Sequence, residues 1–128
     1  MFKLLVSVLP GDIDGQNHVN NTVYLRWVQE IAIAHWRALA PPEAQAVVSW
    51  VVLRHEIDYK AAAVLGDDIE VSTWVGKATR ATFERFTEIH RKRDGQLLSN
   101  ARTLWCPVNP ETGRPVRVSG EVRARFSS

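Results

Sequence analysis

The sequence lacks the features that mark several classes of protein. Its single cysteine, Cys106, excludes a disulfide within the chain and fits a reducing compartment. No apolar run reaches the roughly 20 residues that a membrane-spanning helix needs. The apolar start, from Phe2 to Leu9, is short and contains Lys3 and Ser7, which favours a strand over a signal peptide. We therefore expect a cytoplasmic protein with no membrane partner.

Repeats, linkers and low-complexity segments are also missing, and the 128 residues fit one domain, residues 1–128. Hydrophobic residues make up 45% of the chain and include five tryptophans, enough for a packed core. The net charge is only +2, yet most arginines lie between Lys77 and Arg125. Such a basic half suits either a phosphate-bearing partner or a solvated strand face. The strands lack an aromatic–basic stacking pattern, so no nucleic-acid partner is expected.

Hydrophobic periodicity predicts one strand, one long helix and then four strands. Apolar residues alternate over residues 2–9, and they recur at spacings of three and four from Val23 to Leu39, where Pro41-Pro42 follows. In the next strand, every second residue from Leu53 to Ala61 is assigned to one apolar face that includes His55. The four later strands are predicted at residues 51–61, 69–77, 81–92 and 97–105. We expect hairpins to join them in a meander, followed by a short basic tail that ends in a strand or a single helical turn.

This order of elements predicts an α+β fold, because one helix can cover only one face of an antiparallel sheet of four or more strands. Such a sheet usually hides an edge or its second face against another copy of the chain. The sequence therefore predicts a homodimer, or a dimer of dimers.

A polar stretch from Asp12 to Asn21 comes directly before the predicted helix. Polar side chains are costly to bury unless they are paired, so their concentration where a buried helix begins suggests a functional site. Helix starts also offer free backbone N–H groups and a partial positive charge. A purely structural alternative is that Asp12 and Asp14 form turns and that Asn20, Asn21 or Thr22 caps the helix.

This stretch resembles the hotdog-fold acyl thioesterases, most closely the 4-hydroxybenzoyl-CoA thioesterase group and the plant-type acyl-carrier-protein thioesterases. The motifs that carry the resemblance are Asp12-Ile13-Asp14, His18-Val19-Asn20-Asn21 and Tyr24-Leu25-Arg26-Trp27, with weaker support from Tyr59-Lys60, Gly66-Asp67-Asp68-Ile69 and Thr112-Gly113-Arg114-Pro115. The resemblance implies a hotdog fold, in which an antiparallel sheet wraps around one long central helix. It also implies a dimer with active sites between the subunits.

By position, the resemblance assigns catalysis to Asp14, as nucleophile or general base, with Gln16 and His18 as its polar partners. The chain departs from the family patterns at Gln16, where some members have Asn, and at Asn17, where others have Gly. It also has Ala61-Ala62-Ala63 where the plant-type enzymes place a further glutamate. The substrate therefore stays open. Residues expected to bind substrate are Asn20, Asn21, Tyr24, Trp50, Lys77, Thr79 and Arg80.

The leading hypothesis is hydrolysis of an acyl-CoA or acyl-carrier-protein thioester to a carboxylic acid and a thiol. Backbone N–H groups at the helix start or around Trp50 are candidates for stabilising the oxyanion. A thiol leaves readily, so no metal or separate cofactor is expected, and coenzyme A is part of the substrate. The alternatives are a non-catalytic acyl-CoA binding module and a hotdog-fold enoyl-CoA hydratase with an Asp–His pair; the His-Val-Asn-Asn run argues against the second.

Overall fold

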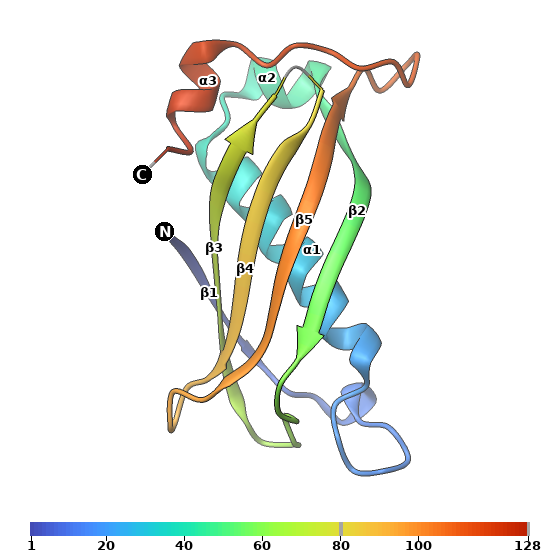
Figure 1. The fold of residues 1–128 in the computed structure, drawn as a ribbon, viewed down its shortest axis with the longest axis vertical. Coiled ribbons are helices and arrows are strands. Elements are labelled where there is room, and N and C mark those ends of the chain that lie inside the picture. The colour runs from blue at the N-terminus through green and yellow to red at the C-terminus, as the bar shows by residue number, and fades with distance from the viewer. Residues whose placement is uncertain (80, 128) are drawn as a thin grey trace.

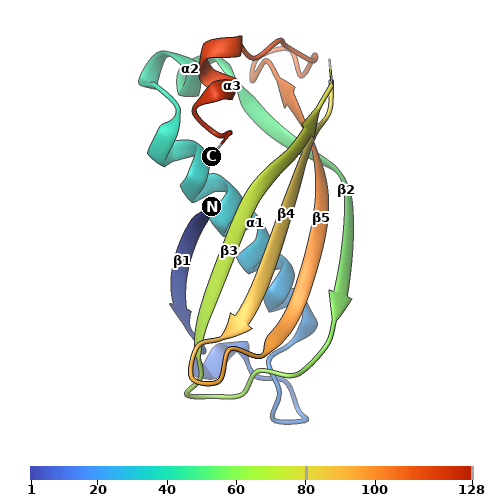
Figure 2. The ribbon, with the colours of Figure 1, turned by 60° about the vertical axis from the view of Figure 1, so that its left-hand side comes forward.

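A computed structural model describes residues 1–79 and 81–127 of the chain. Its five-stranded antiparallel sheet curves around one long helix (Figures 1 and 2), which confirms the predicted α+β architecture. The strands are β1 (Phe2–Ser7), β2 (Ser49–Tyr59), β3 (Asp68–Ala78), β4 (Phe83–Arg91) and β5 (Leu97–Val108). The helices are η1 (Pro10–Asp12, a 3-10 turn), α1 (Asn21–Leu39), α2 (Pro42–Val47) and α3 (Gly120–Ala124).

Helix α1 forms where its apolar residues can face the concave side of the sheet. The side chain of Asn20 accepts a hydrogen bond from the Thr22 backbone N–H (3.0 Å) and so caps the helix. The helix ends at Leu39, before the two prolines. Its buried residues follow the predicted period of three and four: Val23, Tyr24, Trp27, Val28, Ile31, Ala32 and His35. Among the described residues, no helix is both long and apolar enough to cross a membrane.

The predicted meander is wrong in one connection. The strand order is β1-β3-β4-β5-β2, so β2 pairs with β5, and the chain crosses two strands before it enters β3. The cause is the link at residues 60–67, which is anchored at the start of α1. The Ala63 N–H donates to the Tyr24 hydroxyl, and the Ala63 carbonyl accepts from the Val19 N–H, each at 2.9 Å. The Gly66-Asp67-Asp68 turn follows this anchored crossing and does not close a hairpin.

The prediction of which residues of β2 form its apolar, inward-facing side is also wrong at one end of the strand. The register with β5 shifts between Val52 and Arg54, which leaves Leu53 as the extra residue of a β-bulge. His55 and Ile57 are half-buried as predicted, but Leu53 is 55% exposed. Because a bulge changes which residues alternate inward, Trp50 and Val52 take the inner positions before it. An irregularity of this kind leaves no clear mark in an alternating pattern.

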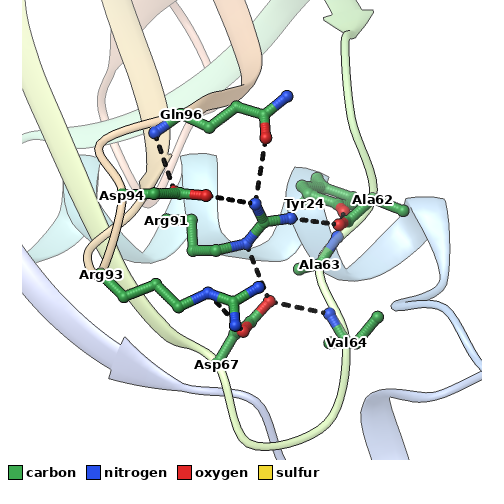
Figure 3. A network of polar contacts seen from close by, with 9 residues as sticks. All are labelled: Tyr24, Ala62, Ala63, Val64, Asp67, Arg91, Arg93, Asp94 and Gln96. Carbon is green, nitrogen blue, oxygen red and sulfur yellow. Dashed lines mark hydrogen bonds and ion pairs between the residues drawn. The ribbon is translucent and has the colours of Figure 1, made fainter.

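Figure 3 shows the ion-pair network that holds the link between β2 and β3 in place. The guanidinium of Arg91 donates to Asp67 (Nε to Oδ2, 3.2 Å), to Asp94 (Nη1 to Oδ2, 2.9 Å) and to the Ala62 carbonyl (Nη2, 2.9 Å). Arg91 and Asp67 are both buried. The ion pairs raise the pKa of Arg91, and the hydrogen bond that Arg91 donates to Asp94 contributes most. The network therefore joins the end of β4 to the loop that supports the start of α1.

Replacing Arg91 by Met should lower the free energy of unfolding by about 3 kcal/mol, because it leaves the buried Asp67 carboxylate without its main partner. The matched control is Arg93→Met. Arg93 is 69% exposed and lies 3.9 Å from the other oxygen of Asp67, so its loss should cost less than about 0.5 kcal/mol. Urea unfolding of both variants checks this, and equal losses would contradict a special role for Arg91.

Candidate active site

Asp14 lies in a tight turn directly before α1. Its Oδ1 accepts the backbone N–H groups of Gln16 (2.8 Å) and His18 (3.3 Å), and its own N–H donates to the His18 carbonyl (2.8 Å). Asn17 closes the turn with a φ of 63°, in the left-handed region that Asn tolerates. The Asp14 Oδ2 makes no hydrogen bond to any residue that the structure describes. The turn thus holds a half-buried carboxylate with one oxygen free to react.

Gln16 and His18 are brought to Asp14 through their backbones. Both residues are exposed, and the contacts to the carboxylate come from their N–H groups and not from the amide or the imidazole. The side-chain roles assigned to these two residues stay predictions. The directly observed effect is that the two N–H groups fix the orientation of the Asp14 carboxylate.

Asp12 has the structural role that was one of the two hypotheses for this stretch. It is 4% exposed, and its two oxygens accept bonds from Arg26 Nη2 (3.1 Å) and the Leu9 N–H (3.0 Å). Asp12 therefore ties the end of β1 to the second turn of α1. It places the Asp14 turn but has no free oxygen for chemistry.

Three predicted substrate-binding residues lie at the start of α1 in structural contacts. Asn20 caps the helix, and the Asn21 carbonyl accepts a bond from the Tyr59 hydroxyl (3.3 Å). Tyr24 is 2% exposed, and its oxygen accepts the Ala63 N–H. Burial raises the pKa of the Tyr24 hydroxyl, so it stays neutral. Binding of substrate by these three residues stays a prediction.

A cavity of about 1060 Å³ lies at the other end of α1, between the helix, the inner side of the sheet and α3. Its walls include the rings of Trp36, Trp50, Phe83 and Phe126. These rings make edge-to-face or stacked contacts in which the ring centroids are 5.1–5.7 Å apart. Trp50 and Lys77 line it, so these two predicted residues share one pocket. The sequence reasoning missed Trp36, Phe83 and Phe126. The signal for Trp36 was its place off the main apolar face of the helix.

The remaining predicted residues lie near the turn between β3 and β4. The Lys77 N–H donates to Glu84 Oε1 (3.1 Å), and the Thr79 hydroxyl bonds that of Thr82 (2.5 Å). Arg80 lies outside the residues that the structure describes. Of the described residues, no three His, Cys, Asp or Glu side chains come together in a way that could hold a metal ion.

A polar cluster of Arg85, His35 and Thr73 lies beneath α1, and its Arg85 is one of the residues that line the cavity. Nη1 of Arg85 donates to Nδ1 of His35 (2.9 Å) and to the Thr73 hydroxyl (3.1 Å). Because arginine only donates, His35 must be neutral, with its proton on Nε2. Burial, with the charge of Arg85 as the second cause, lowers the pKa of His35 to about 4, and burial also lowers the pKa of Arg85 to about 10. This cluster could not be predicted from the sequence, because Arg85 lies within an alternating strand whose other residues are compatible with either face.

The Asp14 turn and the cavity lie at opposite ends of α1. A helix of 19 residues spans about 28 Å, and Figure 1 shows the turn below the sheet and α3 above it. Within one chain, the free carboxylate and the apolar pocket therefore do not meet.

Residues 8–126 match a family model described as the thioesterase-like superfamily. Over 132 residues, the chain is 31% identical to a palmitoyl-acyl carrier protein thioesterase of Cuphea hookeriana, which covers 96% of this chain and 32% of that protein. The chain thus spans about a third of the length of the plant relatives it matches. It is 22% identical to a long-chain acyl-CoA thioesterase of Escherichia coli, with 94% of this chain and 93% of that protein covered.

The fold is shared with solved structures. One example is a 1,4-dihydroxy-2-naphthoyl-CoA thioesterase from Synechocystis, with a TM-score of 0.83 and 19% identity, covering 98% of this chain and 94% of that one. This match confirms that the predicted architecture is the hotdog fold.

The neutral state of His35 predicts a pH dependence of stability. The unfolded chain takes up a proton near the ordinary pKa of 6.5, and the folded chain only near 4. As pH falls through this window the unfolded state binds more protons, so the free energy of unfolding should drop by about 2 kcal/mol between pH 7 and 5.

His35→Gln should remove most of this drop while its amide oxygen still accepts from Arg85. His90→Gln, on the outer face of the sheet, is the control, and chemical unfolding at each pH is the measurement. An unchanged pH profile in His35→Gln would contradict the assignment.

Proposed function

We propose that this chain, which belongs to the thioesterase-like superfamily, hydrolyses an acyl thioester to a carboxylic acid and a free thiol. The observation that carries the proposal is the family match over residues 8–126, which contains the Asp14 turn and all the described lining residues of the cavity except Ser127. Relatives named for acyl-carrier-protein substrates and one named for acyl-CoA support a substrate on either carrier. The relative that matches over nearly its whole length is the acyl-CoA enzyme, which favours coenzyme A. The single, buried cysteine supports the cytoplasm as the compartment.

In the proposed reaction Asp14 supplies the reactive oxygen. The bonds from the Gln16 and His18 N–H groups hold Oδ1, and they leave Oδ2 to attack the thioester carbon or to remove a proton from an attacking water. Attack by Oδ2 would form a mixed anhydride and release the thiolate, and water would then restore the carboxylate. In the water route, the tetrahedral intermediate collapses directly to acid and thiol. Both routes use the same carboxylate.

The proposed site is completed by a second copy of the chain. Strand β2 is an edge of the sheet, and its residues Val51 and Leu53 are 43% and 55% exposed. The nearby Ile33 of α1 is also exposed, at 45%. Exposed apolar edges favour pairing with another strand. The helix and β2 run in opposite directions (Figure 1). A two-fold axis that pairs two β2 edges antiparallel would therefore bring the partner's α1 start, and its Asp14 turn, beside the cavity of the first copy.

Asp14→Asn should lower kcat/KM by at least about 100-fold, the range expected for loss of a general base or nucleophile. The Asn side chain keeps the oxygen that accepts the Gln16 and His18 N–H groups, so the turn and the stability should be retained. Thiol release from short, long and aromatic acyl-CoA substrates is the measurement, and Glu43→Gln on the exposed face of α2 is the control. Unchanged turnover in Asp14→Asn would remove this residue from the mechanism, and thioester binding without any turnover in the wild type would instead indicate a binding module.

Leu53→Lys should convert the dimer to monomers, because a charge on the paired edge opposes strand pairing, and turnover should fall with it. The matched control is Leu5→Lys on β1, the opposite edge of the sheet, where Leu5 is 58% exposed. Sedimentation velocity measures the state of assembly. Dissociation by Leu5→Lys alone would place the dimer contact on β1 instead.

Recovery of turnover on mixing Asp14→Asn with a cavity-blocking Trp50→Arg variant would show that each site uses both copies.

A further inference from the structure

Two buried arginines on the same face of β4 have opposite surroundings. Arg85 and Arg91 are each 9% exposed. Arg91 is ion-paired to Asp67 and Asp94, whereas no carboxylate of residues 1–79 or 81–127 lies within ion-pair distance of Arg85. The pKa values differ accordingly: ion pairs raise that of Arg91, and burial lowers that of Arg85 to about 10. Arg85 is thus a buried cation without a counter-ion among the residues that the structure describes.

A buried charge without a partner is costly, and its neutral contacts offset only part of that cost. The bonds to His35 and Thr73 use Nη1 of Arg85 alone. Nε and Nη2 have no partner among the described residues, and Arg85 is one of the residues that line the cavity. His35 and Thr73 therefore hold one side of the guanidinium, and the other side can bind a ligand in the cavity.

The rest of the cavity wall has the charge expected around an anion. Its described lining residues include four cations, Arg37, Lys77, Arg85 and Arg123, and one carboxylate, Glu84. That carboxylate is occupied, because it accepts bonds from Nε of Arg102 and from the Lys77 N–H. No free negative charge of the described wall competes for Arg85.

The depth of Arg85 indicates which part of a thioester it would meet. Arg37, Lys77 and Arg123 are exposed and suit the phosphates of the thiol carrier. In coenzyme A, the long pantetheine arm separates these phosphates from the thioester sulfur. Arg85 lies on the inner wall under α1, where the acyl group would enter. A guanidinium fork matches a carboxylate in a bidentate geometry.

We propose that Arg85 binds a carboxylate carried by the acyl group, so that the preferred substrates are thioesters of dicarboxylic acids. This inference rests on the proposed thioesterase function and specifies its substrate class. The apolar rings of Trp36, Trp50 and Phe83 would contact the methylene chain between the thioester and the distal carboxylate. His35 and Thr73 act as positioning residues for the guanidinium.

The test compares matched pairs of coenzyme A thioesters with four, six and ten carbons, each pair consisting of the monocarboxylic and the dicarboxylic acyl group. The wild type should show a higher kcat/KM for the dicarboxylic member of at least one pair. Arg85→Met should lower the ratio of dicarboxylic to monocarboxylic kcat/KM by about 10- to 100-fold, the effect of losing a charged hydrogen-bonding partner. Arg123→Met removes the same charge at an exposed part of the wall and should change the ratio less than about threefold.

A binding measurement keeps the inference testable if Arg85→Met folds poorly. Adipate should raise the melting temperature of the wild type more than hexanoate does, and Arg85→Lys, which keeps the charge but loses the planar fork, should reduce that difference. Equal shifts for the two acids in the wild type would overturn the inference.

The outcomes separate the two proposals. Hydrolysis of no thioester in any pair would contradict the proposed function itself. Hydrolysis with a ratio that Arg85→Met does not change would overturn the role of Arg85 and leave the thioesterase intact. If coenzyme A alone inhibits Arg85→Met more weakly than the wild type, and the ratio of dicarboxylic to monocarboxylic kcat/KM is unchanged, Arg85 binds a phosphate of the carrier. That result would overturn its role in binding an acyl carboxylate. An equal change in ratio for Arg123→Met would indicate a general positive field and also count against Arg85.

Discussion

The burial of α1 in the concave face of the sheet is the constraint on which the rest of this structure depends. Its large apolar side chains, such as Trp27, Val28 and Ile31, are nearly inaccessible, and each contributes about 1.5–3 kcal/mol when fully buried. The middle of the helix is therefore filled with core. Polar chemistry is left to its two ends, where the Asp14 turn precedes the helix and the cavity opens beside its last turns.

Each end is held by a different buried polar cluster. At the start of α1, Asp12 binds Arg26, and Arg91 fastens the loop whose Ala63 bonds both Val19 and Tyr24. Every charge in this cluster has an opposite partner, as a buried structural network needs. At the other end, the described hydrogen-bond partners of Arg85 are the neutral groups of His35 and Thr73. The contrast is the physical reason for assigning structure to one arginine and ligand binding to the other.

The separation of the two ends also explains why a single chain is an incomplete picture of the proposed enzyme. One copy has a carboxylate with a free oxygen before the start of α1, and a pocket of suitable size for an acyl group beside the second half of the helix, from Gln29 onward. The exposed edge of β2 lies between them. In the proposed dimer, an antiparallel pairing of two such edges would place each carboxylate at the pocket of its partner, so assembly and catalysis would depend on the same apolar edge.

The sequence by itself determined the elements and the location of the polar turn. Periods of two and of three to four residues mark the strands and α1, since each reflects one buried face, and the Asp12–Asn21 stretch stands out because polar groups seldom gather where a buried helix begins. Tertiary structure decided what depends on distant contacts. The bulge at Leu53 changed which residues of β2 before it face inward. The anchoring of Ala63 replaced the expected hairpin by a connection that crosses two strands between β2 and β3. Only the packing of α1 on β4 made Arg85 a buried cation facing a cavity, because alternation alone does not say whether a charged residue points to solvent or to the interior.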